Sequence, residues 1–340
     1  MTSFGRYLTY RLKKSVLGTL IFSVVALLMT NLAVRNALDN EHSHLHTGLH
    51  IFGVILGIIC TLIPMMENAC FKNRRNLDTL YFLPISRFKM ALAHYLSGWI
   101  QVTVIYTVSF VWGTLLLFSR SELFHLFYLL PYYFLSLLIG LMMYSVFSLL
   151  FGEGNTERDG ITFSVLGIFV LMLIFEAIGT LVSDGGAWSK KWNFVDPTWG
   201  IVYMPISNLT DVFQVKLHVQ PLPEYEFNIA NSTMNEWYMF VVWGIIGVAS
   251  AIGYFITFMR KGAEKIGDIS DSWFGYKTLI PIYAYSLFFL LGEEGSFLIF
   301  IFIMMFAGYF IYRRSFRLKA SDLLMIALSF IPIFAHFIFM

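Results

Sequence analysis

Long apolar runs separated by short polar segments make up most of the chain. A helix needs roughly 20 apolar residues to cross a membrane, and many of these runs reach that length. The pattern therefore predicts an all-α polytopic membrane protein. The seventh run is short and the ninth contains Pro332, so eight and nine spans both remain open. The predicted spans lie at about 15–34, 49–69, 91–118, 124–150, 161–182, 237–259, 278–292, 296–312 and 321–340.

The first 14 residues have a different pattern from the spans. Phe4, Tyr7, Leu8 and Leu12 fall on one face of a helix, while the basic residues of this segment fall elsewhere. An amphipathic helix with a cationic polar face is typical of a segment that lies in the membrane interface. We therefore expect residues 1–14 to form an interfacial helix on the cytoplasmic leaflet.

Composition supports the membrane assignment. Hydrophobic residues make up 58% of the 340 residues and charged residues only 13%, against about 25% charged residues in soluble domains. The two cysteines, Cys60 and Cys70, lie inside and at the end of one apolar run. This placement argues against a disulfide framework.

Lys and Arg are distributed unevenly between the polar segments. With the N-terminus placed in the cytoplasm, 18 of the 23 Lys and Arg residues fall in predicted cytoplasmic segments and five in predicted external ones. Cytoplasmic loops of membrane proteins carry an excess of cations. The distribution therefore predicts a cytoplasmic N-terminus and a multi-pass protein of the plasma membrane.

The segment between the second and third spans is the most cationic connection in the first half of the chain. Residues 71–92 hold five cations and one acid, Asp78. Each half has apolar residues at helical spacing, and Pro84 separates the halves because proline restricts the residue before it and lacks an amide donor. Ser86 is well placed to cap the following helix. Two interpretations stay open: a surface that a soluble partner pushes on, and a basic hairpin held by anionic lipids.

Several motifs of soluble catalytic domains are missing from the sequence. A phosphate-binding loop needs Gly-Lys within G-x-x-x-x-G-K-[ST], and the chain contains no Gly-Lys dipeptide. The H-E-x-x-H and G-x-S-x-G patterns are also missing. We therefore expect no ATP site in this chain, no catalytic residue and no bound cofactor, and no partner that is a nucleic acid.

Two sets of polar residues are candidate sites. Four histidines, His42, His44, His46 and His50, cluster in a predicted external loop, where they form either a transition-metal site or a solvated turn. We expect the turn, and so no metal. Glu176 is the one acid well inside a predicted span; it either lines a cavity or lies hydrated near the outer end of its helix.

Four further features complete the candidate residues and segments. Gly53 and Gly57 form G-x-x-x-G in the second span, which favours close helix packing. Glu67 ends that span and is expected at the membrane interface. The turn 153–159 is polar and short, and the segment 183–236 is a long external loop that looks able to fold.

The layout resembles the ABC-2-type permeases, the membrane subunits of one class of ABC transporters. The matching parts are an interfacial helix at 1–14, a six-span domain at 15–260 with a cytoplasmic coupling helix at 71–90, and the external region 183–236. The coupling loop of that family reads as an acidic residue, a Leu and then a Leu-Pro-x-Ser-Arg turn. The matching residues here are Asp78, Leu80, Leu83, Pro84, Ser86 and Arg87. The glutamate often found upstream in the family is replaced by Asn73 and Asn76.

The resemblance implies a function for the chain. It would be a bacterial permease subunit that exports an amphipathic or hydrophobic substrate such as a peptide, antibiotic or lipid. Its partners would be two ATP-binding subunits, which hold ATP and magnesium, a second permease chain, and membrane lipids. The segment 261–340 adds two or three spans to the six-span core. The coupling residues implied are Arg74, Arg75, Asp78, Leu80, Pro84 and Arg87, with 153–159 as a second contact.

Two other classes of protein remain as alternatives. A membrane-embedded enzyme acting on lipids would use acids such as Asp268 and Asp271, and a secondary transporter would use Glu176. Such proteins concentrate ionisable residues at one depth in the membrane. The sequence predicts no such concentration within the spans, which favours the permease.

Overall fold

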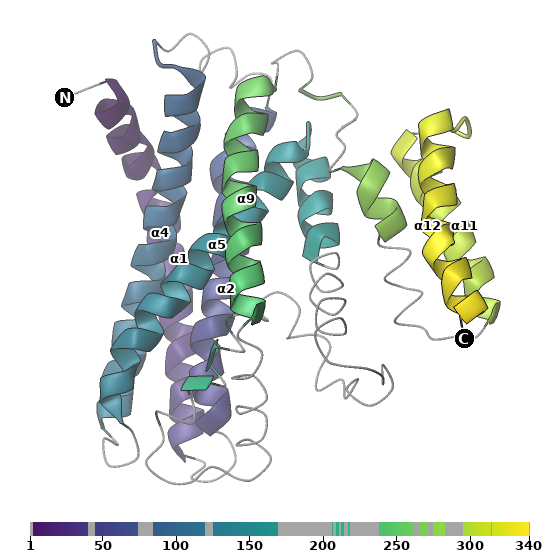
Figure 1. Ribbon diagram of the computed structural model, residues 1–340. Helices are drawn as coiled ribbons and strands as arrows, with labels where there is room; N and C mark the ends of the chain where they lie inside the picture. The colour runs from purple at the N-terminus through teal and green to yellow at the C-terminus, as the bar shows by residue number, and fades with distance from the viewer. Residues whose placement is uncertain are drawn as a thin grey trace. The chain divides into compact units, whose positions relative to one another are not determined.

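A computed structural model describes most of the chain, shown in Figure 1. The structure describes residues 3–39, 45–73, 84–119, 125–168, 238–261, 266–268, 270, 275–282, 295–313 and 315–339, together with 206, 209, 210, 212, 213 and 217. Every secondary-structure element within these ranges is a helix. The all-α prediction is thereby confirmed for this part of the protein.

The helices follow the apolar runs of the sequence. The α-helices are α1 (Ser3–Asp39), α2 (Leu45–Ala69), α4 (Arg87–Phe118), α5 (Leu129–Glu153), α9 (Tyr238–Arg260), α11 (Gly295–Arg313) and α12 (Ala320–Phe339). A 3₁₀ turn, η1 (Cys70–Lys72), follows α2, and another, η3 (Leu126–Tyr128), precedes α5. Residues 157–168 and 276–282 are also helical. The fourth predicted span begins at Leu129 instead of 124, because η3 precedes it.

Five of the described helices are long and apolar enough to cross a membrane. They comprise Phe4–Asn36, His50–Lys72, Arg87–Phe118, Leu129–Glu153 and Phe240–Arg260, and a shorter apolar helix covers Ile299–Arg313. These correspond to the first, second, third, fourth and sixth predicted spans. Most of the fifth and seventh predicted spans lies outside the described residues, so the total of eight or nine spans stays a prediction.

The N-terminal helix is longer than the sequence pattern indicates. Residues 3–14, expected as a separate interfacial helix, and the first predicted span form one continuous helix, α1, of 37 residues. Tyr7 and Arg11 on this helix are buried in the protein. An orientation of residues 1–14 along the membrane surface stays a prediction.

The chain divides into two compact units. The first comprises Met1–Cys70, Asp78–Leu149 and Asp196–Lys261, and the second comprises Phe71–Leu77, Leu150–Val195 and Gly262–Met340. Within the first unit, α4 contacts α1, α2 and α9, and α1 contacts α2; Figure 1 shows these long helices running alongside one another. Helix α4 is therefore the central element of the first unit.

Two glycines bring other helices close to α4. A Cβ at Gly98 would meet the Tyr144 hydroxyl and would lie 3.2 Å from Cγ of Glu67, and a Cβ at Gly113 would clash with the Phe52 ring. Because no side chain projects at these points, large side chains of α2 and α5 pack directly against the α4 backbone. Close approach over small residues is the usual basis of helix packing in membranes.

The second unit contains a helical hairpin formed by α11 and α12. Ile301, Met305, Tyr309 and Tyr312 of α11 pack with Ile326 of α12, and Figure 1 shows the two helices side by side. Arg313 donates two hydrogen bonds to the Asp322 carboxylate, at 2.9 and 2.7 Å. This bidentate ion pair closes the hairpin where α11 ends and α12 begins.

Candidate functional site

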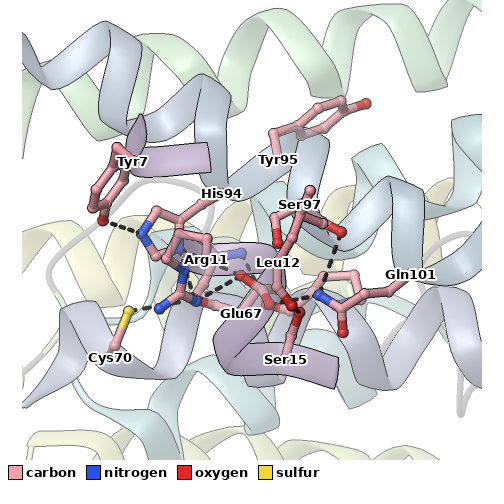
Figure 2. Close-up of polar contacts among 12 residues, drawn as sticks. Tyr7, Arg11, Leu12, Ser15, Glu67, Cys70, His94, Tyr95, Ser97 and Gln101 are labelled. Carbon is pink, nitrogen blue, oxygen red and sulfur yellow. Dashed lines mark hydrogen bonds and ion pairs between the residues drawn. The ribbon is translucent and has the colours of Figure 1, made fainter. Parts of the chain in front are cut away.

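A buried polar cluster joins three helices of the first unit. Tyr7 and Arg11 lie one turn apart on α1, Glu67 lies near the end of α2, and His94 and Gln101 lie two turns apart on α4. Residues spaced by four and by seven share one face of a helix, so α1 and α4 turn these side chains toward Glu67. Figure 2 shows them converging between the helices. We call these five residues the polar joint.

An ion pair forms the centre of the polar joint. Nη2 of Arg11 lies 2.6 Å from Oε2 of Glu67, and the two side chains are 9% and 5% exposed. Gln101 donates from Nε2 to the other carboxylate oxygen, Oε1, at 2.6 Å. Both oxygens of Glu67 therefore have a donor, one from α1 and one from α4.

His94 makes a second link between the same three helices. Its Nδ1 lies 3.1 Å from the backbone carbonyl oxygen of Glu67, and its Nε2 lies 2.8 Å from the Tyr7 hydroxyl. A carbonyl oxygen only accepts, so Nδ1 carries the proton. In the neutral ring Nε2 is then the acceptor, and the Tyr7 hydroxyl donates to it.

Burial makes the polar joint sensitive to the loss of any partner. His94 is fully buried, and Glu67 is 4% exposed. A buried charge that loses its partner costs about 3–5 kcal/mol, whereas an intact pair with its hydrogen bonds satisfied is tolerated. The cluster therefore holds α1, α2 and α4 in one register.

Neighbouring side chains extend this connection to α9. Asn68 follows Glu67 and donates to the Pro64 carbonyl at 2.8 Å, while its Oδ1 accepts from the Tyr254 hydroxyl of α9 at 2.8 Å. Tyr144 of α5 donates to the Tyr95 carbonyl of α4 at 3.1 Å. The cytoplasmic end predicted for α2 is thus bonded to neighbours on several sides.

The structure adds a contact that the sequence pattern does not predict. Glu67, expected at the membrane interface, is buried between helices and paired with Arg11, while its depth in the membrane stays a prediction. Arg11 itself belongs to the segment 1–14, outside the predicted spans. The residues involved come from α1, α2 and α4, which are far apart in the sequence, so their proximity follows from helix packing alone. The one signal in the sequence that could have indicated this cluster is that Arg11, Glu67 and His94 each lie near the end of an apolar run.

Most of the implied coupling residues lie outside the described part of the chain. This applies to Arg74, Arg75, Asp78 and Leu80. Pro84 is exposed, and Arg87, also exposed, begins α4 and lies 3.5 Å from the Lys261 carbonyl oxygen. The capping role predicted for Ser86 is confirmed, because its side chain accepts from the Lys89 amide at 3.4 Å.

The other candidate residues are described only in part. Glu176, Asp271 and most of the external region 183–236 lie outside the described residues, and Asp268 is exposed. Gly53 is buried, and a Cβ there would lie 2.9 Å from the Ile206 side chain; Gly57 is buried in α2.

Only two of the four clustered histidines lie among the described residues. His42 and His44 lie outside the described residues, while His46 and His50 belong to α2. Within the described ranges, no group of three or more His, Cys, Asp or Glu residues is placed to hold a metal ion. The comparison with known proteins adds no family: no protein-family model matches the chain, and no curated protein is significantly similar to it.

The side chains of the polar joint are bonded to one another and buried away from solvent. A catalytic base or nucleophile must reach its substrate, yet the His94 ring is fully buried and both of its nitrogens have partners within the protein. Both Glu67 oxygens are likewise occupied. These contacts tie α1, α2 and α4 together, because a shift of any of the three helices would break a buried polar contact.

Proposed function

We propose that this chain is the membrane permease subunit of a bacterial transporter driven by a separate ATPase, with segment 71–90 as its coupling element. The observation that carries the proposal is the position of the polar joint along the chain. Glu67 lies two residues before the end of α2, and His94 lies two turns after the start of α4. The segment that connects α2 to α4 is therefore flanked at both ends by the polar joint.

This arrangement suits a coupling element. A partner that displaces the connection moves the ends of α2 and α4, and the buried contacts of Arg11, Glu67 and His94 carry α1 with them. Three helices then move as one body instead of deforming separately. Rigid-body motion of packed helices is a common form of switching because packed interfaces adopt discrete arrangements.

The chemistry of the segment supports contact with a protein partner. It supplies cations at Arg74, Arg75, Arg87 and Lys89, with Asp78 and the apolar Leu80 between them. Charge-assisted hydrogen bonds around a buried apolar anchor are typical of a strong contact between two proteins. Leu80 would enter an apolar notch of the ATPase, and Arg75 and Asp78 would pair with charges at its rim.

The transport cycle follows from this coupling. Closure of two ATP-binding subunits would push the segment, and the helices would rock between inward and outward access. The helical bundle and its resemblance to exporters favour an amphipathic or hydrophobic cargo leaving the cell. A fold does not by itself name a substrate, so the cargo is proposed only as a class.

The first experiment is co-purification of the tagged protein from its native membrane in mild detergent. A stoichiometric ATP-binding subunit is expected, whose ATPase activity is stimulated in the complex. Leu80→Asp places a charge in the apolar notch and should abolish stimulation at normal expression. Lys319→Asp introduces an acid at an exposed position outside the segment and serves as the control. Persistent stimulation in Leu80→Asp, or a protein that purifies alone at every salt concentration, would overturn the proposal.

One observation favours a membrane-embedded enzyme as the second candidate. The Tyr7 hydroxyl lies 2.8 Å from Nε2 of His94, the contact between a hydroxyl and a base that activates nucleophiles in acyl-transfer enzymes. On the other side of the ring, Nδ1 is bonded to the Glu67 backbone carbonyl, and the Glu67 carboxylate lies 3.6 Å away. In that case Tyr7→Phe would abolish activity on a lipid substrate, while Tyr10→Phe, at a residue 59% exposed, would leave it unchanged. Transport that persists in both variants excludes this candidate.

A further inference from the structure

A second polar cluster surrounds the turn at 153–160, inside the second compact unit. Helix α5 ends at Glu153, Gly154 and Asn155 are buried, and the helix 157–168 follows. Lys72 donates from Nζ to the carbonyls of Gly152, at 2.9 Å, and of Gly154. A cation on the last carbonyls of a helix satisfies groups that have no partner within the helix and is favoured by the helix dipole.

The next helix begins with its own cap. The Thr156 hydroxyl accepts from the Asp159 amide at 3.1 Å, the contact expected between an N-cap residue and the third helical position. The Asp159 carboxylate is bonded to residues far along the chain. Ser270 donates to Oδ2 at 2.7 Å, and the Tyr276 hydroxyl donates to Oδ1 at 2.8 Å.

Ser270 is bonded to both sides of the turn. It is fully buried, and its Oγ accepts from the Asn155 amide at 2.7 Å while donating to Asp159. Its carbonyl accepts from the Tyr312 hydroxyl of α11 at 2.8 Å. One serine thus connects the end of α5, the start of the helix 157–168, and α11.

The backbone near Ser270 is shaped for this contact. Gly267 has a φ of 90°, a conformation that side-chain-bearing residues rarely adopt, and its amide donates to the Asn155 carbonyl at 3.2 Å. Tyr276 packs edge-on against Phe163, with ring centroids 4.7 Å apart, and lies 4.5 Å from the Tyr312 ring. Hydrogen bonds from Gly267 and Ser270 and the aromatic contact of Tyr276 therefore hold these residues against the turn and the helix that follows it.

From these contacts we infer that residues 266–268, 270 and 276 position the 153–160 turn, with Ser270 and Tyr276 as positioning residues that act through Asp159 and Asn155. The inference rests on the proposed function and deepens it. The turn carries Glu157 and Arg158, both exposed, and would be the second contact with the ATPase. The part of the chain beyond residue 260 would then have a role in coupling, because it would orient the turn through which the six-span core contacts the ATPase.

Hydrogen exchange of the full-length protein in nanodiscs tests the positioning without reference to transport. Ser270→Ala removes the acceptor of the Asn155 amide and a donor to Asp159, and Tyr276→Phe removes the other donor. Loss of a hydrogen bond to a charged group should speed amide exchange in residues 153–160 by about 10-fold. Ser270→Thr keeps the hydroxyl and should restore the wild-type exchange rate.

Tyr309→Phe is the matched control. The Tyr309 hydroxyl donates to the Lys277 carbonyl at 2.8 Å, so this variant loses the same chemical group in the same unit without touching the turn. It should leave exchange at 153–160 unchanged. Unchanged exchange in Ser270→Ala and Tyr276→Phe would show that the turn holds itself and would overturn the inference. An equal rise in Tyr309→Phe would show that loss of any such hydroxyl in this unit loosens the turn, and it would overturn the specific roles of Ser270 and Tyr276.

ATPase stimulation in the complex then links the turn to coupling. Ser270→Ala and Tyr276→Phe should reduce stimulation severalfold while the ATPase still co-purifies, and Tyr309→Phe and Ser270→Thr should not. Faster exchange with unchanged stimulation would overturn the role of the turn in coupling. If the wild-type protein has no ATPase partner, the proposed function fails by itself, and the exchange experiment alone decides whether Ser270 and Tyr276 position the turn.

Discussion

At the scale of single residues, Glu67 is bonded to every neighbouring helix of the polar joint. Its carboxylate accepts hydrogen bonds from Arg11 of α1 and Gln101 of α4, and its backbone carbonyl accepts one from His94 of α4. Because the site is buried, these contacts are not exchanged for water when one is lost. The residue therefore affects both the stability of the bundle and, on the proposed function, its movement.

A double-mutant cycle measures this coupling. Arg11→Met leaves the Glu67 carboxylate buried without its ion-pair partner and should lower stability by about 3–5 kcal/mol. Glu67→Leu should be costly for the same reason, while Arg11→Met with Glu67→Leu should recover most of the loss. Thermal unfolding in detergent provides the measurement. If the loss of stability in the double variant equalled the sum of the losses in the two single variants, Arg11 and Glu67 would not interact, which would contradict the buried ion pair.

At the scale of secondary-structure elements, the packing of α4 depends on positions without side chains. Gly98 faces Tyr144 of α5 and Glu67 of α2, so the polar joint and the helix packing meet at the same point of α4. The proline and the cap at 84–86 act differently. They determine where α4 begins, with Ser86 bonded to the Lys89 amide, but not what α4 packs against.

Gly98→Val tests the close packing of α4. The new side chain would collide with the Tyr144 hydroxyl, and overpacking of this kind costs about 1–3 kcal/mol. Gly244→Val on α9 is the matched control, because nothing lies within 4 Å of a Cβ at that position. Only Gly98→Val should lower the temperature of thermal unfolding. An equal decrease in both variants would show that the helix propensity of valine, and not packing against Tyr144, is responsible.

At the scale of the whole molecule, the described helices agree with the pattern of apolar runs. The first, second, third, fourth and sixth runs become helices able to cross a membrane, and the eighth and ninth become α11 and α12. The orientation of these helices in the membrane rests on the Lys and Arg distribution and stays a prediction.

Labelling of single introduced cysteines tests that orientation. Glu157→Cys, exposed on the 153–160 turn, is predicted to face the cytoplasm, whereas Asn208→Cys is predicted to face the exterior. A membrane-impermeant maleimide applied to intact cells should label only Asn208→Cys. Labelling at position 157 would show that the topology is the reverse of the one proposed. Residues 71–90 and 153–160 would then face the exterior, where they could not contact a cytoplasmic ATPase. The native cysteines, Cys60, which is fully buried, and Cys70, serve as the background.

Local features of the fold could be predicted because they depend on neighbouring residues. Apolar runs of sufficient length predict helices, and Pro84 followed by Ser86 predicts the start of α4. The polar joint could not be predicted, because Arg11, Glu67 and His94 are separated by at least 27 residues of chain. Each of them alone has the pattern of an interfacial residue at the end of a span.

The sequence by itself determined that this is a helical protein rich in potential membrane spans, because hydrophobicity and helical spacing are properties of short segments. Only the tertiary structure decided which polar residues are paired. The polar joint arises where Gly98 allows α2 and α5 to approach α4, and Gly267, Ser270 and Tyr276 are bonded to Asn155 and Asp159 of the 153–160 turn. A buried polar group is tolerated only with its partners, and partners distant in the sequence are brought together only by packing.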